Sequence, residues 1–352
     1  MKIAFYSNQL GHRGTDKNLK YLAKFNQTVL NNESIIITSN SGSHTALETF
    51  KDYETHIIDN NQFNYICEKT KVDYFYAIKP GYIDYSVVDV CKQLNHFVYT
   101  EGWEFHGHRC AFISDYLVDK ANKAFLSSTD EEFQSKQNFF PLKKYEWSLP
   151  FYCKEYNSTE ENLKQYLSIP KDKIVLGYMG GSDQFSIEWV RDILIKYCFE
   201  NNDVYFIFLG VDPWFIPSSC SEYFKFLPFS IEEDFICKFI NTCDGMIHAR
   251  ADGETFGLSI AEFSLKNKPI LTYNTFSDDS HPLEYNKYMD TAHLDLLKEK
   301  GWYYRTPSEL YFIIKNFKDI KEQRKNINYR ENYQLFNSPE YIMKRFSEIY
   351  LS

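Results

Sequence analysis

Two glutamates with seven residues between them, Glu254 and Glu262, form the most informative polar pair in this chain. An ionised carboxylate offers two acceptor oxygens, which suit the paired hydroxyls of a sugar or a ribose. Residues 250–254 form a polar loop that contains Gly253. Such a loop at a helix start leaves N–H groups unpaired at the positive end of the helix dipole, which is typical of anion sites. The pair therefore predicts a phosphate site flanked by hydroxyl-binding carboxylates. The alternative is a capped surface helix with two solvated glutamates.

A strand, a helix and a second strand must position these two side chains. The apolar run 246–249 predicts a buried strand, and apolar residues at helical spacing predict a helix over 258–265. Pro269 ends that helix, and 270–273 is the next strand. One helical turn rises about 5.4 Å, so the two glutamates can reach opposite sides of a bound phosphate.

The string 254–262, Glu-Thr-Phe-Gly-Leu-Ser-Ile-Ala-Glu, resembles the E-x7-E motif of retaining glycosyltransferases with the GT-B fold. Gly257, Leu258, Glu262 and Pro269 all fall at the positions that the motif and its context require. The match is close over residues 243–273 and looser over the rest of the chain.

This resemblance implies an α/β fold of two Rossmann-like domains that face a cleft, with a C-terminal helix that crosses back to the N-terminal domain. The expected divisions are an acceptor domain at 1–150, a nucleotide-sugar donor domain at 151–335 and the returning helix at 336–352. Its implied activity is retaining transfer of a sugar, as by a hexosyltransferase, from a UDP- or GDP-sugar, with no metal and no further cofactor. The implied acceptor is a glycan, a lipid, a protein or a small molecule.

The resemblance also implies roles for individual residues. Glu254 would bind the transferred sugar, Glu262 the ribose, and Arg250 the charge that develops on the leaving phosphate. The other residues implied to bind the nucleotide sugar lie on loops at strand ends: Thr255, Phe256, Gly257, Leu258, Gly180, Gly181, Gly11 and Gly14.

The chain departs from the family pattern at the first strand of its second half, 173–179. Related enzymes often carry an Arg after the Gly of this strand and a Lys a few residues later. Tyr178 holds the first place, and 183–186 contain no Lys. Arg250, or less plausibly Arg191, would replace these cations. The departure indicates a divergent member or an inactive one.

A second glycine loop, 7–15, follows the first predicted strand. Thr15 and Asp16 are suited to cap the helix after it. In open α/β sheets such loops bind ligands at the carboxyl ends of the strands. The resemblance favours a functional loop around His12 and Arg13, and the alternative is an ordinary strand-to-helix turn.

Residues 101–109 form a loop rich in histidine and aromatic side chains. His106 and His108 have three interpretations. They could bind a metal, but no Cys or acidic partner stands at metal-ligand spacing. They could be ordinary loop residues. They could instead face the cleft near the transferred sugar, a role that the resemblance assigns first to His106.

Alternation of short apolar runs with helical segments predicts a parallel sheet in each half. In the first half we expect strands at 2–6, 34–38, 55–59, 74–78, 96–100 and 124–127, and helices at 15–25, 62–69, 86–94 and 113–122. In the second half we expect strands at 173–179, 204–209, 224–229 and 302–305, and helices at 186–199, 231–242, 307–316, 318–331 and 339–351.

Composition narrows the class of protein. A chain of 352 residues with a net charge of −9 argues against a general nucleic-acid or anionic-membrane binder. We expect no signal peptide, no transmembrane helix and a cytoplasmic location. The eight cysteines include no C-x-x-C pair and are expected to be free thiols. The adjacent Asp278 and Asp279 have the wrong context for a metal-binding D-x-D motif.

Two other classes of function remain open. One is a nucleotide-sugar epimerase or hydrolase on the same fold. The other is a non-catalytic protein that binds a sugar or a nucleotide, which the missing Arg and Lys make conceivable.

Overall fold

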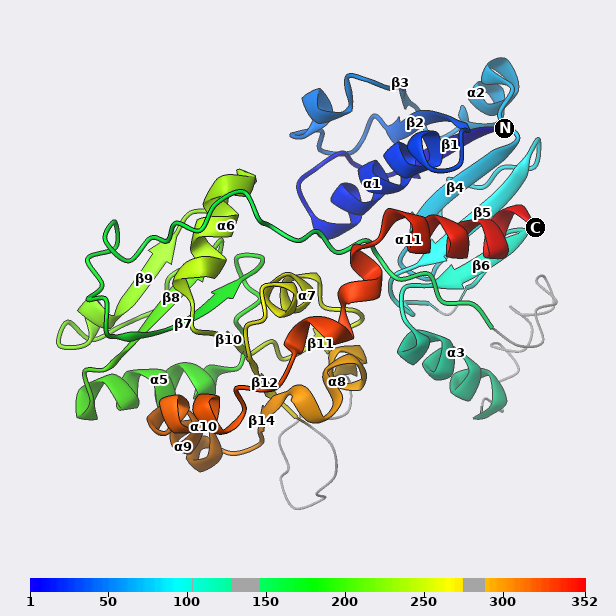
Figure 1. The fold of residues 1–352 in the computed structure, drawn as a ribbon. Helices are drawn as coiled ribbons and strands as arrows, with labels where there is room; N and C mark the ends of the chain where they lie inside the picture. The colour runs from blue at the N-terminus through cyan, green and yellow to red at the C-terminus, as the bar shows by residue number, and fades with distance from the viewer. Residues whose placement is uncertain (103, 128–145, 275–288) are drawn as a thin grey trace. The chain divides into compact units, whose positions relative to one another are not determined.

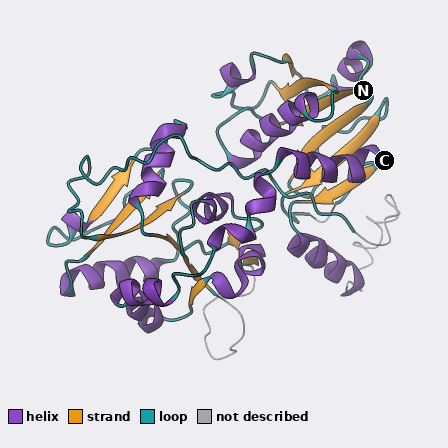
Figure 2. Cartoon of the chain, viewed as in Figure 1, coloured by secondary structure: helices purple, strands orange, loops and turns teal. Residues whose placement is uncertain are grey.

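The structure is a computed structural model that describes residues 1–102, 104–127, 146–274 and 289–352. Contacts divide the chain into two units, Met1–Tyr152 with Phe336–Ser352, and Cys153–Leu335. Each unit is an α/β domain with helices packed around a parallel sheet, which confirms the expected fold class (Figure 1, Figure 2).

The first unit contains a six-stranded parallel sheet in the order β3-β2-β1-β4-β5-β6. Its strands are β1 (Lys2–Ser7), β2 (Glu33–Ser39), β3 (Glu54–Ile58), β4 (Tyr74–Lys79), β5 (Lys92–Phe97) and β6 (Arg109–Phe112). Its helices are α1 (Gly14–Thr28), α2 (Phe63–Thr70), α3 (Asp115–Ser127) and α11 (Pro339–Phe346), with short 3-10 and π turns at Leu47–Phe50 and Ser347–Leu351.

Both faces of this sheet are covered. Ile3 and Phe5 point into one core, which they share with α1 and α11, whereas Ala4 and Tyr6 point into a second core with α2. Successive side chains of a strand alternate between faces. A strand buried on both sides must therefore be apolar at every position, as residues 3–6 are.

The C-terminal helix α11 belongs to the first unit although it follows the second in sequence. Ile342, Met343 and Phe346 are fully buried there, and the Phe346 ring lies 6.3 Å from Phe5 and 5.5 Å from Tyr76, between centroids. Tyr350 then donates a hydrogen bond of 2.8 Å to the backbone oxygen of Asn95.

The second unit repeats the plan with the sheet order β14-β12-β10-β7-β8-β9. Its strands are β7 (Ile174–Met179), β8 (Val204–Leu209), β9 (Phe224–Leu227), β10 (Gly245–His248), β12 (Ile270–Tyr273) and β14 (Trp302–Tyr304), with a small sheet of β11 (Gly253–Glu254) and β13 (Asp290–Thr291). Its helices are α5 (Glu188–Glu200), α6 (Glu233–Thr242), α7 (Leu258–Leu265), α8 (Ala292–Leu297), α9 (Pro307–Lys315) and α10 (Phe317–Gln323). Short 3-10 helices span Ser221–Tyr223, Lys298–Lys300 and Tyr329–Asn332, and a fourth, Gln334–Asn337, spans the boundary with the first unit.

In both sheets the strand order reverses direction beside the first strand. Counted within each unit, the order is 3-2-1-4-5-6, so the crevice between strands 1 and 4 is the topological switch point where such sheets bind ligands. The loops that follow β1 and β4, and those that follow β7 and β10, therefore lie at the two places where ligands are expected.

Several predicted elements are wrong. Residues 86–91 form no helix, and the strand lies at Lys92–Phe97 rather than at 96–100. Residues 124–127 continue α3 instead of forming a strand. The helix predicted at 318–331 ends at Gln323. An apolar run alone does not separate a strand from a buried helix, which explains the error at 124–127.

No helix in the described part of the chain is both long and apolar enough to span a membrane. All eight cysteines are free, and six of them are buried.

Packing of α11 against the first sheet predicts a large loss of stability in Phe346→Ala. Removing a fully buried ring should lower the free energy of unfolding by about 3–5 kcal/mol, because it leaves a cavity. The matched control is Phe312→Ala, since that helical Phe is 62% exposed, and its change should stay within about 0.5 kcal/mol. Urea denaturation followed by circular dichroism measures both. Equal losses would show that α11 does not support the core.

Candidate functional site

Three side chains meet at the carboxyl end of β10. Nε2 of His248 lies 3.3 Å from Oε1 of Glu254, and Nη1 of Arg250 donates to Oε2 at 3.2 Å. His248 is fully buried, and only 13% of the Glu254 side chain is exposed. The carboxylate is therefore held at both oxygens by groups from its own loop and strand.

The backbone that presents Glu254 depends on one glycine. Gly253 has a φ of 66°, and a Cβ built there would lie 2.0 Å from the backbone oxygen of Asp290. This close approach lets β11 pair in parallel with β13, with Glu254 opposite Thr291. Only glycine combines the left-handed conformation with so short a contact. The small sheet thus directs Glu254 toward His248 and Arg250.

Charge around this site keeps Glu254 ionised. Burial raises the pKa of the carboxyl, but the hydrogen bond from His248 and the charge of Arg250 outweigh it, so the pKa lies below its ordinary value. His293 packs beside His248 at 5.0 Å between ring centroids. Burial, with a smaller effect from His248, lowers the pKa of His293 to about 3, so this ring is neutral at pH 7.

The start of α7 has the geometry of an anion site. Gly257 precedes the helix with a φ of 86°, and no described side chain caps the first turn. Leu258 and Ser259 are half-buried, whereas Phe256 is buried with its ring 6.1 Å from that of Tyr333. Thr255, half-buried, connects Glu254 to this turn. A Cβ built at Gly257 would lie 3.5 Å from the Cβ of His293, which packs against His248, so the start of α7 lies beside the charged cluster.

Glu262 lies one turn into α7, as its spacing predicts, and has a partner that the sequence did not reveal. The hydroxyl of Tyr156 donates to Oε1 of Glu262 at 3.2 Å. Tyr156 belongs to the segment that opens the second unit, 106 residues away in sequence. Glu254 thus contacts a histidine and an arginine, whereas Glu262 accepts from a tyrosine hydroxyl.

The loop after β7 is tied to the loop after β10, because Ala251 N–H donates to the Ser186 hydroxyl at 2.9 Å. Its glycine N–H groups are already used. Gly180 N–H bonds to the Leu209 oxygen at 3.2 Å, and Gly181 N–H to the Gln184 side chain at 2.9 Å. This arrangement disfavours Gly180 and Gly181 as phosphate donors while Gln184 holds its position.

The residues at the departure from the family pattern are also engaged. Tyr178 is fully buried, and its hydroxyl donates to the Gln184 oxygen at 3.4 Å. Arg191 bonds to the backbone oxygen of Phe185 and lies over the Trp214 ring at 5.0 Å from its centroid. Arg250 is therefore better placed than Arg191 to replace the expected cations.

In the first unit, the loop after β1 closes on a buried carboxylate. Asp16 accepts hydrogen bonds of 3.1 Å from the Ser7 hydroxyl and from Gly11 N–H. Neither Thr15 nor Asp16 is the N-cap residue of α1, because the helix begins at Gly14 after Arg13, so the predicted position of the cap is wrong. Burial raises the pKa of Asp16, although these donors oppose the shift.

A buried ion pair lies at the end of the neighbouring strand β4. The fully buried Lys79 donates to the Asp84 carboxylate and to the Ser86 hydroxyl. His106 is near this pair and buried, with Nδ1 2.9 Å from the Glu104 oxygen, and burial lowers its pKa, with a smaller effect from Lys79. His108 instead accepts from Gln93 N–H at 3.0 Å, which indicates a structural role.

No group of three or more His, Cys, Asp or Glu side chains in the described ranges is arranged to hold a metal ion. Asp278 and Asp279 lie outside the described residues.

Sequence reasoning missed His248, His293 and Tyr156. For His248 a signal existed, since it is a polar residue at the end of the predicted strand 246–249, two residues before Arg250. No local signal existed for His293 or Tyr156, because both reach the site from distant segments.

No family model and no curated protein sequence matches the chain. Solved structures do. A glycosyltransferase from Rickettsia africae is similar over 99% of this chain and 97% of its own, with a TM-score of 0.71 and 14% identity. The HepE protein of Anabaena in complex with UDP-glucose is similar over 99% and 98%, with a TM-score of 0.67 and 14% identity.

A proposed UDP-N-acetylglucosamine 2-epimerase from Listeria monocytogenes is similar over 100% of this chain and 97% of its own, with a TM-score of 0.55 and 9% identity. At these identities the likeness establishes the fold. The chain has the two-domain GT-B fold that the residues around Glu254 and Glu262 predicted.

The lowered pKa of Glu254 predicts how stability changes with pH in Glu254→Gln. Ionised Glu254 stabilises the folded state fully above its ordinary value of 4.5, and this contribution is lost as the pH falls through the lower folded-state pKa. The difference in free energy of unfolding between wild type and variant should therefore be constant from pH 7 to about 5 and shrink below it. Urea titrations between these limits and pH 3.5 measure it. A difference that grows at low pH would mean that burial outweighs the pairing.

Proposed function

We propose that the chain transfers a hexosyl group from a UDP- or GDP-sugar to an acceptor hydroxyl, with retention of anomeric configuration. The observation that carries this proposal is the cluster of Arg250, Glu254 and His248 beside the uncapped start of α7. This cluster lies at the switch point of the second sheet, where a nucleotide is expected.

In this proposal the diphosphate binds at the start of α7. N–H groups of Leu258 and Ser259 donate to phosphate oxygens, and Arg250 adds positive charge. Glu262 accepts from the ribose hydroxyls, and Tyr156 orients its carboxylate. Glu254 accepts from hydroxyls of the transferred sugar, while His248 fixes its position.

The proposed reaction is a substitution at the anomeric carbon. A bond forms between this carbon and the acceptor oxygen on the face from which the nucleoside diphosphate departs, and the bond to the phosphate oxygen breaks. The bonding pair leaves with the diphosphate, whose oxygen takes the proton of the acceptor hydroxyl. No protein nucleophile is assigned. Arg250 and the start of α7 are assigned to stabilise the charge on the leaving group, without a metal ion.

The acceptor is assigned to the first unit, where Gly11, Gly14 and His106 follow strands β1 and β5 at the carboxyl edge of the sheet. His106 has a lowered pKa, which favours a neutral imidazole that can exchange hydrogen bonds with a hydroxyl.

The comparisons support a nucleotide-sugar ligand, and they leave epimerisation as a competing activity. The HepE structure contains UDP-glucose, so UDP-glucose is the first donor to test. The Listeria protein favours epimerisation as the second candidate, on a weaker likeness. Product analysis separates the two activities. Purified protein with UDP-glucose and UDP-N-acetylglucosamine, with and without acceptor glycans, should form a glycoside and release UDP. An isomerised sugar or an unchanged donor would contradict transfer.

A thermal-shift screen of nucleotide sugars identifies the donor independently of the acceptor. A ligand at 100 times its dissociation constant stabilises the native state by about 2.7 kcal/mol. UDP- and GDP-sugars should therefore separate clearly from each other.

Arg250→Ala should weaken UDP binding far more than uridine binding, because Arg250 is assigned to the phosphates alone. Loss of a charged hydrogen bond costs about 1.5–3 kcal/mol, which is about tenfold or more in affinity. Calorimetry with both ligands measures the difference. The exposed Arg305 of the same unit provides the control, since Arg305→Ala should bind both as wild type does. If uridine and UDP weaken alike in Arg250→Ala, the assignment is wrong.

The two glutamates should separate binding from turnover. Glu262→Gln should lose about tenfold in UDP affinity because it removes the charged acceptor of the ribose hydroxyls. Glu254→Gln should keep UDP affinity but lose about tenfold or more in turnover at saturating donor, since each ~1.4 kcal/mol of lost positioning is tenfold in rate. Reversed phenotypes would show that the roles are exchanged.

A further inference from the structure

The second sheet has a pocket of about 430 Å³ at the edge opposite to the candidate donor site. Ile174 begins β7, Asp244 directly precedes β10, and Pro269 directly precedes β12, and all three line the pocket. These strands are neighbours in the sheet. The pocket therefore lies at their amino ends, whereas Arg250 and Gly180 follow their carboxyl ends.

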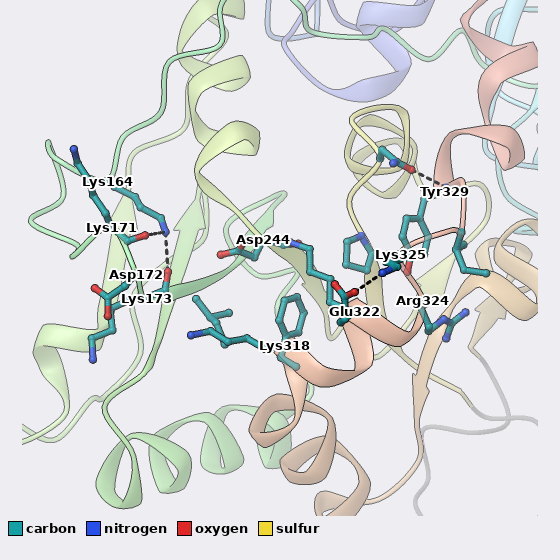
Figure 3. Close-up of a pocket in the computed structure, with 16 residues that line it drawn as sticks. Lys164, Lys171, Asp172, Lys173, Asp244, Lys318, Glu322, Arg324, Lys325 and Tyr329 are labelled. Carbon is teal, nitrogen blue, oxygen red and sulfur yellow. Dashed lines mark hydrogen bonds and ion pairs between the residues drawn. The ribbon is translucent and has the colours of Figure 1, made fainter.

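Its lining is strongly basic in a chain that is acidic overall. Seven of the 16 lining residues are Lys or Arg and three are Asp or Glu, which leaves a net formal charge of +4. The whole chain carries −9. Figure 3 shows basic residues on two sides of the pocket: Lys164, Lys171 and Lys173 from the segment before β7, and Lys318, Arg324 and Lys325 from α10 and the residues after it. Lys321 of α10 also lines the pocket.

Most of this positive charge has no carboxylate partner. Lys321 pairs with Asp244 at 3.2 Å and Lys325 with Glu322 at 2.5 Å. Among the residues that the structure describes, Lys171, Lys173 and Lys318 show no ion pair. Like charges gathered in a concave site repel one another and focus the potential on whatever enters it.

Two further cations are held in place without being neutralised. Lys164 donates to the backbone oxygens of Lys171 and Lys173 at 3.0 and 2.7 Å. Arg324 donates to those of Gly301 and Glu299, and its guanidinium lies over the Trp302 ring. Carbonyl partners fix the position of a cation and leave its full charge to act on a ligand. Part of the basic lining is thus ordered in advance.

The pocket also has apolar walls that strengthen these charges. Phe317 is 1% exposed, and a Cβ at Gly245 would come within 3.2 Å of its ring. Pro269 and the largely buried Tyr329 also contribute to the lining. Charges beside a low-dielectric wall interact more strongly than charges in open solvent.

We propose that this pocket is a second anion site that binds a polyvalent phosphate group, separate from the diphosphate site at α7. A phosphate with two or more charges matches several ammonium groups at once, whereas a single carboxylate matches fewer. The group belongs either to a soluble phosphorylated metabolite or to a phospholipid headgroup, which share this chemistry.

The test uses inorganic pyrophosphate and two pairs of charge-reversal variants. In Lys173→Glu with Lys318→Glu, pyrophosphate affinity measured by calorimetry should fall by about tenfold or more, because two charge-assisted contacts become repulsive. The matched control reverses two lysines of the first unit, Lys24→Glu with Lys51→Glu, at exposed positions with the same change in net charge. It should stay within about twofold of wild type. If the charge-reversal variant does not fold, Lys173→Gln with Lys318→Gln replaces it.

Arg250→Ala separates this site from the proposed donor site. If the pocket binds the probe, pyrophosphate binding survives in Arg250→Ala and is lost in the pocket variant. If binding is lost in Arg250→Ala and unchanged in the pocket variant, the pocket proposal is overturned while the donor site stands. Equal losses in the pocket variant and the lysine control, or no binding by wild type, also overturn it.

A vesicle assay then identifies the source of the phosphate. If the wild type sediments with vesicles that contain phosphatidic acid, whose phosphate monoester can carry two charges, but not with pure phosphatidylcholine vesicles, and the pocket variant does not sediment, the site binds a lipid headgroup. Pyrophosphate binding without sedimentation assigns the site to a soluble phosphate.

Discussion

The candidate site depends on the ionised carboxylate of Glu254, which is largely buried. An unpaired buried carboxylate would take up a proton, and it would then be a poor acceptor for sugar hydroxyls. His248 and Arg250 prevent this by bonding to one oxygen each. The position of Glu254 between them depends on the turn at Gly253 and on the pairing of β11 with β13. A small sheet with only two strands thus decides the chemistry available at the end of β10.

Parallel sheets give the second unit two chemically different edges. At the carboxyl edge, loops after β7 and β10 collect the charged cluster and the uncapped start of α7. At the amino edge, segments before β7, β10 and β12 surround a basic pocket. All strands point the same way, so the loops that follow the strands gather at one edge and the segments that precede the strands gather at the opposite edge. Two anion sites can therefore exist in one domain without sharing a residue.

The departures from the family pattern have a coherent physical explanation. Tyr178 occupies the place of an expected cation, but a tyrosine carries no positive charge, and this side chain is fully buried. Gly180 and Gly181 donate their N–H groups within the protein. In the proposed mechanism, Arg250 and the start of α7 bind the diphosphate instead. Arg250 also pairs with Glu254, so the proposed mechanism couples the group assigned to the phosphates with the group assigned to the sugar.

The sequence by itself determined the fold class, the strand–loop–helix unit around α7 and the spacing of its two glutamates, because these follow from local periodicity, glycine positions and a specific motif. Tertiary structure decided the rest. Strand β5 was misplaced because Gln93, Asn95 and His96 are polar yet buried, and their partners Ser86, His106 and Tyr76 lie 7, 11 and 20 residues away in sequence. Tyr156 and His293 reach the site in the same way, and the basic pocket joins residues 164–173 to 318–325. Burial and long-range hydrogen bonds set these positions, and no local pattern encodes them.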